Sequence, residues 1–269
     1  MQYDHLTWVF QSNNINGKDR SALKQAAIQL GCKTEELGIV PFSHESIEPP
    51  PLIEGCCVVY GSGGLLKLAN REGWKPAGWD GSKFDTSEVL ANFGCLALNG
   101  NGKEVLLSNT AVEAAANEWE QIFVRPVSES KEFPGTVYSL HELQERVEKL
   151  RSSNYFESQN NLMLIAPFKK LGREWRAFVV DHKLISISQY AESGVLKRSV
   201  DVPDIASEFV HKAIQMYAPA PCFVIDIAEE LNIDSTILCV VEFNSINSSG
   251  LYDCDAGKIV SAVSDYILN

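Results

Sequence analysis

The sequence lacks any apolar run long enough to span a bilayer, which argues against an integral membrane protein. Near its start no basic segment is followed by an apolar one, so we expect no secretory signal peptide. The seven cysteines are odd in number, scattered, and without a CxxC pair. This usage favours reduced, mostly buried thiols over a disulfide framework, and it predicts a cytoplasmic protein.

Basic residues are outnumbered, with 23 lysines and arginines against 35 aspartates and glutamates and a net charge of −12. This balance argues against a nucleic-acid-binding surface, although local clusters decide whether a small anion binds. The five histidines show no metal-ligand spacing, and neither a Ser-His-Asp nor a Cys-His arrangement is evident. Cys254 lies close to Tyr252 but has no paired histidine, so we interpret it as a structural thiol rather than a nucleophile.

What is present is ordinary for a globular protein: 269 residues, 45% hydrophobic and 22% charged, enough for one large domain or two modest ones. In the N-terminal part, apolar runs predict strands, and helical spacing predicts a helix that ends at Gly31. The predicted strands are Leu6–Phe10, Leu37–Phe42 and Cys56–Tyr60, and the predicted helix is Ser21–Leu30. Alternating strands and helices indicate a small α/β layer.

A glycine-rich turn, Gly61-Ser62-Gly63-Gly64, follows the third predicted strand and precedes a predicted helix at Leu65–Arg71. A turn between a strand and a helix can present backbone N–H groups to an anion. The turn is not a Walker loop, because no Gly-Lys-Ser/Thr follows it, and it is not a dinucleotide-binding fingerprint. The alternative is an ordinary tight turn without a ligand.

In the central part, Ser139 and Glu142 form a capping box that opens an amphipathic helix. Other helices are predicted near Ser87–Phe93 and at Ala111–Asn117, and strands at Gln121–Val127, Leu162–Pro167, Glu174–Asp181 and Leu184–Tyr190. Strand alternation places three charged residues among apolar neighbours: Arg125, Glu174 and Arg176. We therefore interpret these three as ligand-binding residues rather than members of a solvated face.

A hairpin is predicted from two apolar runs, Cys222–Ala228 and Thr236–Phe243. Glu242 and Asn244 share one face of the second strand, and Asp226 joins them if the first strand faces the same way. Two carboxylates and an amide on an apolar sheet need a partner, and hard oxygen ligands of this kind suit Mg²⁺. The alternative is a pair of acids at a sheet edge in water.

The charges are also distributed unevenly along the chain. Twelve of the 23 lysines and arginines lie between Arg125 and Arg198, whereas ten acidic residues lie between Asp201 and Asp255. The first stretch offers ligands for phosphate and the second offers ligands for a metal ion. A nucleoside triphosphate with Mg²⁺ needs both.

Four motifs in order resemble those of the ATP-grasp superfamily: FVRPVSESKEFPG, EWRAFVVDHKLISISQY, FVIDIA, and VVEFN followed by SSGLYDCD. More narrowly, they are similar to a clade of short, often phage-encoded ATP-grasp proteins. The resemblance covers Gln121 to about Asp255 and, more loosely, Val58 to Asn99. It implies an α+β/α/β fold in which two α+β subdomains clasp ATP. It also implies an N-terminal α/β subdomain at 1–109 and an ATP-grasp domain at 110–269, itself divided into a small subdomain at 110–168 and a large one at 169–269.

The resemblance also implies roles for individual residues. The positions matching nucleotide-binding residues are Arg125, Lys131, Leu164, Ile165, Ala166, Glu174 and Arg176. Within that set Arg176 and Lys131 are the catalytic candidates, and Lys131–Gly135 matches the flap over the phosphates. Asp226, Glu242 and Asn244 match the Mg²⁺ ligands. This flap has one glycine where many relatives have several, and Ala166-Pro167 stands where an acidic residue is common.

The activity that the resemblance implies is ATP- and Mg²⁺-dependent ligation of a carboxylate to an amine through an acyl phosphate. The expected partners are ATP and carboxylate and amine substrates, either small molecules or a peptide or protein terminus, in a cytoplasm (that of the host if the protein is phage-encoded). Candidate residues for the substrate are Gly61, Ser62, Gly63, Ser249 and Gly250. The alternatives are a small-molecule phosphotransferase and a non-catalytic nucleotide-binding module.

Overall fold

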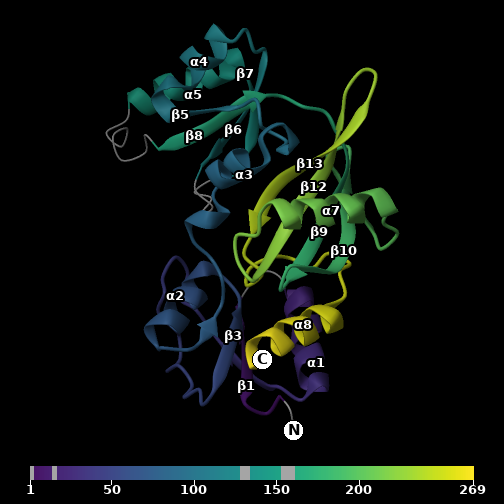
Figure 1. The fold of residues 1–269 in the computed structure, drawn as a ribbon. Helices are drawn as coiled ribbons and strands as arrows, with labels where there is room; N and C mark the ends of the chain where they lie inside the picture. Colours follow the sequence, from purple (N-terminus) through teal and green to yellow (C-terminus); the bar gives the residue numbers. More distant parts are fainter. Residues whose placement is uncertain (1–2, 14–16, 128–133, 153–160) are drawn as a thin grey trace. The chain divides into compact units, whose positions relative to one another are not determined.

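The computed structural model describes residues 3–13, 17–127, 134–152 and 161–269. The chain divides into two compact units, each assembled from segments that are distant in the sequence. The first unit comprises Met1–Asp80, Arg173–Ile227 and Asn244–Asn269, and the second comprises Gly81–Gly172 and Ala228–Phe243. Figure 1 labels their helices and strands. In the described residues no helix combines the length and the hydropathy needed to cross a membrane.

The N-terminal sheet of the first unit is parallel, with strand order β2-β1-β3-β4. Its elements are β1 (Leu6–Gln11), α1 (Gly17–Leu30), β2 (Lys33–Leu37), β3 (Cys56–Tyr60), α2 (Gly63–Arg71) and β4 (Pro76–Ala77). Strand β1 is buried along its whole length because both of its faces are covered. Trp8 and Phe10 pack with Leu23 of α1, whereas Val9 packs with Leu65 of α2. The predicted α/β layer is therefore present.

One predicted strand in this layer is wrong. The second strand is Lys33–Leu37 rather than Leu37–Phe42. Four of its five residues are at least partly exposed, which suits a charged edge strand. Phe42 is instead fully exposed and has a positive φ of 58°. The apolar residues after Leu37 attracted the strand prediction, but Gly38 and Pro41 interrupt them.

The second sheet has strand order β11-β10-β9-β12-β13 and includes both predicted hairpins. Its strands are β9 (Leu171–Val180), β10 (Lys183–Glu192), β11 (Val195–Ser199), β12 (Cys222–Leu231) and β13 (Thr236–Asn244). Asp181 and His182 form the turn between β9 and β10, with φ of 49° and 58°, as a two-residue hairpin turn requires. Strand β11 and the helices α7 (Asp204–Met216) and α8 (Ala256–Leu268) were not predicted.

The second unit contains a four-stranded sheet with order β5-β8-β6-β7. Its elements are η1 (Ser82–Phe84), α3 (Thr86–Phe93), η2 (Gly94–Leu96), β5 (Lys103–Leu106), η3 (Leu107–Asn109), α4 (Thr110–Ala116), β6 (Gln121–Pro126), β7 (Thr136–Ser139), α5 (Leu140–Arg151) and β8 (Leu162–Pro167). Leu143 and Val147 of α5 pack on Ile122 of β6. The predicted capping box is confirmed, since Ser139 N donates to Glu142 Oε2 at 2.7 Å and Glu142 N donates to Ser139 Oγ at 3.2 Å.

Candidate functional site

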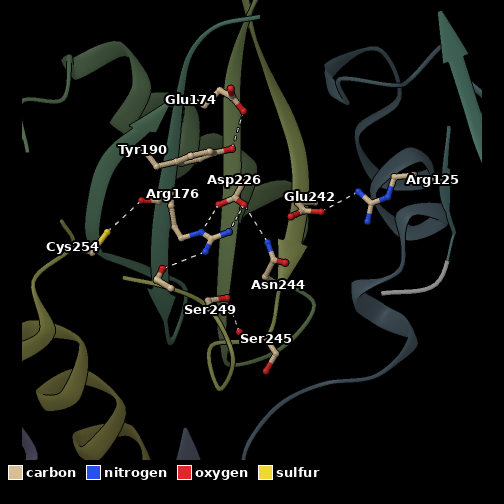
Figure 2. A network of polar contacts seen from close by, with 11 residues as sticks. Arg125, Glu174, Arg176, Tyr190, Asp226, Glu242, Asn244, Ser245, Ser249 and Cys254 are labelled. Atoms are coloured by element: carbon tan, nitrogen blue, oxygen red, sulfur yellow. Dashed lines mark hydrogen bonds and ion pairs between the residues drawn. The ribbon is translucent and has the colours of Figure 1, made fainter. Parts of the chain in front are cut away.

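The centre of the candidate site in the first unit is a buried ion pair between Arg176 on β9 and Asp226 on β12 (Figure 2). Arg176 Nε donates to Asp226 Oδ1 at 2.8 Å, and Arg176 Nη2 donates to Asp226 Oδ2 at 2.7 Å. Only 11% of the arginine side chain and 3% of the aspartate side chain are exposed. Burial opposes the charged form of Arg176, but the charge and hydrogen bonds of Asp226 outweigh burial and raise the pKa of the guanidinium. Both groups are therefore held ionised.

Asn244, at the end of β13, extends this pair, because its Nδ2 donates to Asp226 Oδ2 at 3.2 Å. It is 7% exposed. Glu242 lies two residues earlier on the same strand, so alternation directs both side chains to the same face. In the second unit Glu242 Oε2 accepts a hydrogen bond from Arg125 Nη1 at 3.0 Å. Each predicted metal-binding carboxylate thus contacts one of the predicted phosphate-binding arginines.

The chemistry of this donor set fits Mg²⁺. Asp226, Glu242 and Asn244 supply four carboxylate oxygens and one amide oxygen, which are the hard ligands that this ion prefers. Among the residues described, no three His, Cys, Asp or Glu side chains form a metal-binding group. A site built here therefore has two carboxylates and an amide, and it needs phosphate or water oxygens to complete its coordination.

Two tyrosines that the sequence did not indicate line the same face of the sheet. Tyr190 O–H donates to Glu174 Oε2 at 2.9 Å, and the rings of Tyr190 and Tyr252 stack with centroids 4.9 Å apart. The Arg176 guanidinium carbon lies 5.9 Å from the first ring centroid and 5.0 Å from the second. Burial raises the pKa of Glu174 above its ordinary range, while the Tyr190 hydrogen bond opposes that rise. Glu174 therefore combines a buried carboxylate with a phenol donor.

The two turns predicted to hold substrate also lie in the first unit. Gly61 N donates to Asn247 O at 2.8 Å, and Ser62 N donates to Gln11 Oε1 at 2.7 Å. Ser249 Oγ donates to Ser245 O at 2.7 Å (Figure 2). The carbonyl of Gly250, the next residue, accepts from Arg176 Nη1 at 3.2 Å. The structure thus brings the C-terminal turn to the ion pair, and the glycine turn to the residues beside it.

The remaining predicted residues lie in the second unit or outside the described residues. Leu164, Ile165 and Ala166 are fully buried on β8, which is an interior strand between β5 and β6. Their predicted contact with adenine remains a prediction. Lys131 and most of the predicted flap lie outside the described residues. Cys254 is a buried thiol 3.2 Å from Ser188 Oγ, and burial raises its pKa, in keeping with a structural role.

The family is decided by comparison with known protein families. A family model described as an ATP-grasp domain, the second family of its clade, matches residues 101–262. The chain is an ATP-grasp protein. The predicted superfamily is confirmed, and the predicted ATP-binding ligase character agrees with this membership. Among curated protein sequences no match was found.

Solved structures share the fold of this ATP-grasp protein at low sequence identity. A D-cycloserine synthetase superposes with a TM-score of 0.65 and 13% identity, over 97% of this chain and 99% of that one. A RimK domain ATP-grasp protein from Sphaerobacter thermophilus gives the same TM-score and identity, over 98% and 100%. The D-alanine–D-alanine ligase from Bacillus anthracis complexed with ATP gives 0.63 and 12%, over 98% and 97%. The predicted ATP-grasp fold is thereby confirmed, whereas the subdomain boundaries remain predictions.

Tyr190 and Tyr252 illustrate what sequence reasoning missed in this ATP-grasp protein. Tyr190 falls where the pairing of β10 with β9 shifts register, between Gln189 opposite Trp175 and Ala191 opposite Glu174. A bulge of this kind re-aims a side chain, and simple alternation along the strand does not anticipate it. Tyr252 lies in a loop with a positive φ of 53°. No local pattern marked either residue as a partner of Arg176.

Proposed function

We propose that this ATP-grasp protein is an ATP- and Mg²⁺-dependent ligase that joins a carboxylate to an amine through an acyl phosphate. The observation that carries the proposal is the buried Asp226, which is gripped by Arg176 and Asn244 next to the turn containing Gly250. An ionised pair with so little exposure is costly to bury, and it is therefore weak support for a purely stabilising role. Its place in the family motifs supports a role with nucleotide and metal.

The proposed reaction has two displacements. A carboxylate oxygen attacks the γ-phosphorus of ATP, the bond to the β,γ-bridging oxygen breaks, and ADP leaves. The amine nitrogen then attacks the acyl carbon, the bond from that carbon to the phosphate oxygen breaks, phosphate leaves, and the amine releases a proton to water. Catalysis of this kind consists mainly of positioning and charge neutralisation, so it needs neither a serine nor a cysteine nucleophile.

The residues divide between the two charges of that reaction. Arg125 and Arg176 orient phosphate oxygens, and Arg176 has N–H groups to spare, because three of its five are used by Asp226 and Gly250. Asp226, Glu242 and Asn244 are the residues that would hold Mg²⁺. When bound, that ion neutralises charge on the phosphate oxygens. The carboxylate and the amine are small molecules or a peptide terminus.

The test combines product analysis with variants of the metal-binding residues. The protein is incubated with ATP, Mg²⁺, hydroxylamine and a panel of amino acids, peptides and other carboxylates. Formation of a hydroxamate together with ADP and free phosphate is the expected result. Asp226→Asn and Glu242→Gln are expected to abolish turnover while the fold persists. The matched control is Asp181→Asn, which changes an exposed aspartate paired with Lys183 in the β9–β10 turn and is expected to leave turnover unchanged.

Each alternative gives a different product. Transfer of phosphate to a stable small-molecule ester, without free phosphate, would identify a phosphotransferase. Nucleotide binding without turnover for any compound in the panel would identify a binding module. If Asp226→Asn and Glu242→Gln consume ATP at the rate of Asp181→Asn, the assignment of these residues to the metal is refuted.

A further inference from the structure

Asn247 is a buried amide in the loop that follows β13, and it is 4% exposed. Its Nδ2 donates to Val59 O at 2.6 Å and to Ala77 O at 3.2 Å. Its Oδ1 accepts from Trp79 N at 2.9 Å and from Ser245 Oγ at 3.2 Å. An asparagine amide has two N–H donors and an oxygen with two lone pairs, so all four positions are used. One side chain therefore links the end of β3, the segment from β4 to Trp79, and the loop.

The orientation and the space of this amide are both determined. Two carbonyl oxygens face its nitrogen, and an N–H and an O–H face its oxygen, so the flipped orientation would set an acceptor against two carbonyls. A Cβ added at Gly78 would lie 2.3 Å from Asn247 Oδ1 and 2.4 Å from Nδ2. The neighbouring backbone is thus shaped to this one side chain.

Backbone and side-chain contacts beside Asn247 hold the two predicted substrate turns. Gly61 N donates to Asn247 O at 2.8 Å, which attaches the glycine turn directly to this residue. Tyr60 O–H donates to Ser249 O at 3.0 Å, and Arg176 Nη1 donates to Gly250 O at 3.2 Å. The loop is therefore fastened on one side to the glycine turn and on the other to the Arg176–Asp226 pair. All of these residues belong to the first unit.

We propose that Asn247 is a positioning residue for the acceptor side of the reaction. It holds the turn at Gly61–Gly63 and the turn at Ser248–Gly250 at a fixed separation, so that one carboxylate substrate contacts backbone from both. The inference rests on the proposed function where it places substrate at these turns. A carboxylate suits them because turns of this kind expose backbone N–H groups.

The nucleotide side of the site does not depend on Asn247 in the same way. Asp226 lies within β12 and Asn244 ends β13, and Arg176 grips Asp226 from β9. Loosening the loop should therefore disturb the carboxylate substrate and leave ATP in place. A misplacement of about 1 Å costs on the order of 100-fold in rate, so an effect of tens of fold on the use of the carboxylate is reasonable.

The variants are chosen to break the link with little change of shape. Asn247→Asp is isosteric but replaces both Nδ2 donors by an oxygen facing two carbonyls. Tyr60→Phe keeps the buried ring and removes only the O–H that reaches Ser249. Ser264→Ala is the matched control, because it removes a fully buried partner of Trp8 Nε1 elsewhere in the same unit. It therefore costs stability without touching either turn.

The kinetic measurement uses the carboxylate that supports hydroxamate formation in the wild type. Asn247→Asp is expected to raise the KM for that carboxylate, or lower kcat, by about 10- to 100-fold. Tyr60→Phe is expected to change the same constants less and in the same direction. In both variants the KM for ATP stays within about twofold of wild type, and Ser264→Ala changes neither KM. If Asn247→Asp and Tyr60→Phe behave like Ser264→Ala, or alter the KM for ATP alone, the proposal is overturned.

A second measurement needs no substrate and separates this inference from the proposed function. Amide hydrogen exchange at Gly61 and Trp79 is expected to rise in Asn247→Asp and not in Ser264→Ala, because their N–H groups bond to Asn247. If the wild type forms no hydroxamate with any carboxylate, the proposed function fails, and exchange still decides whether Asn247 holds the turns. Unchanged exchange at both amides would overturn that role, and a rise at both supports it. Should Asn247→Asp not fold, Tyr60→Phe carries the kinetic arm.

Discussion

The buried pair of Arg176 and Asp226 predicts a loss of stability that is separate from any loss of activity. Asp226→Asn removes the negative charge that compensates a guanidinium with only 11% of its side chain exposed. Removing one partner of a buried ion pair costs roughly 3–5 kcal/mol, because the other charge stays in the interior uncompensated. Asparagine keeps one oxygen that can accept from Arg176, so we expect the lower end of that range, about 3 kcal/mol. A typical domain has only about 5–15 kcal/mol in total.

Urea unfolding followed by tryptophan fluorescence measures this loss. With a slope of about 2 kcal/mol per molar, the unfolding midpoint of Asp226→Asn should fall by about 1.5 M. The double variant Asp226→Asn/Arg176→Met removes both charges and should recover part of the loss, with a coupling energy of about 2 kcal/mol or more. Asp181→Asn changes an exposed ion pair and should cost less than about 0.5 kcal/mol. The reasoning is refuted if Asp226→Asn is no less stable than Asp181→Asn.

Two further predictions concern Glu174 and Arg125. Burial raises the pKa of Glu174 in the folded state, so its contribution to stability is present below its unfolded pKa, near 4.5, and is lost as the pH rises through the folded pKa. Glu174→Gln should therefore lose less stability than wild type between about pH 4 and pH 8, and an identical pH dependence of the unfolding midpoint would contradict the assignment. Arg125→Ala removes the partner of Glu242 and should weaken binding of a non-hydrolysable ATP analogue with Mg²⁺ by about 10-fold, measured by calorimetry. Arg71→Ala, in an exposed pair, is the control and should bind as wild type does.

The sequence by itself determined the strand and helix positions wherever the local pattern was strong. The hairpins around Asp181 and Asn232, the parallel strand at Cys56–Tyr60 and the Ser139–Glu142 cap are all present in the structure. Side-chain alternation along a strand and the chemistry of a helix N-terminus are local properties, so nearby residues suffice to predict them. The same alternation, with the order of four motifs, indicated Asp226, Asn244 and Arg176, which the structure brings into contact.

Only the tertiary structure decided what those residues touch. Phosphate binding was predicted for Arg176 and Arg125, but no sequence pattern indicated that they pair with Asp226 and Glu242. Such pairs join strands far apart in the chain, and sequence spacing carries no information about their distance. The same holds for Asn247, which looked like an ordinary turn residue. Its four hydrogen bonds reach segments 170 and 188 positions away as well as its own loop, and burial makes each of them matter because an unpaired polar group there is costly.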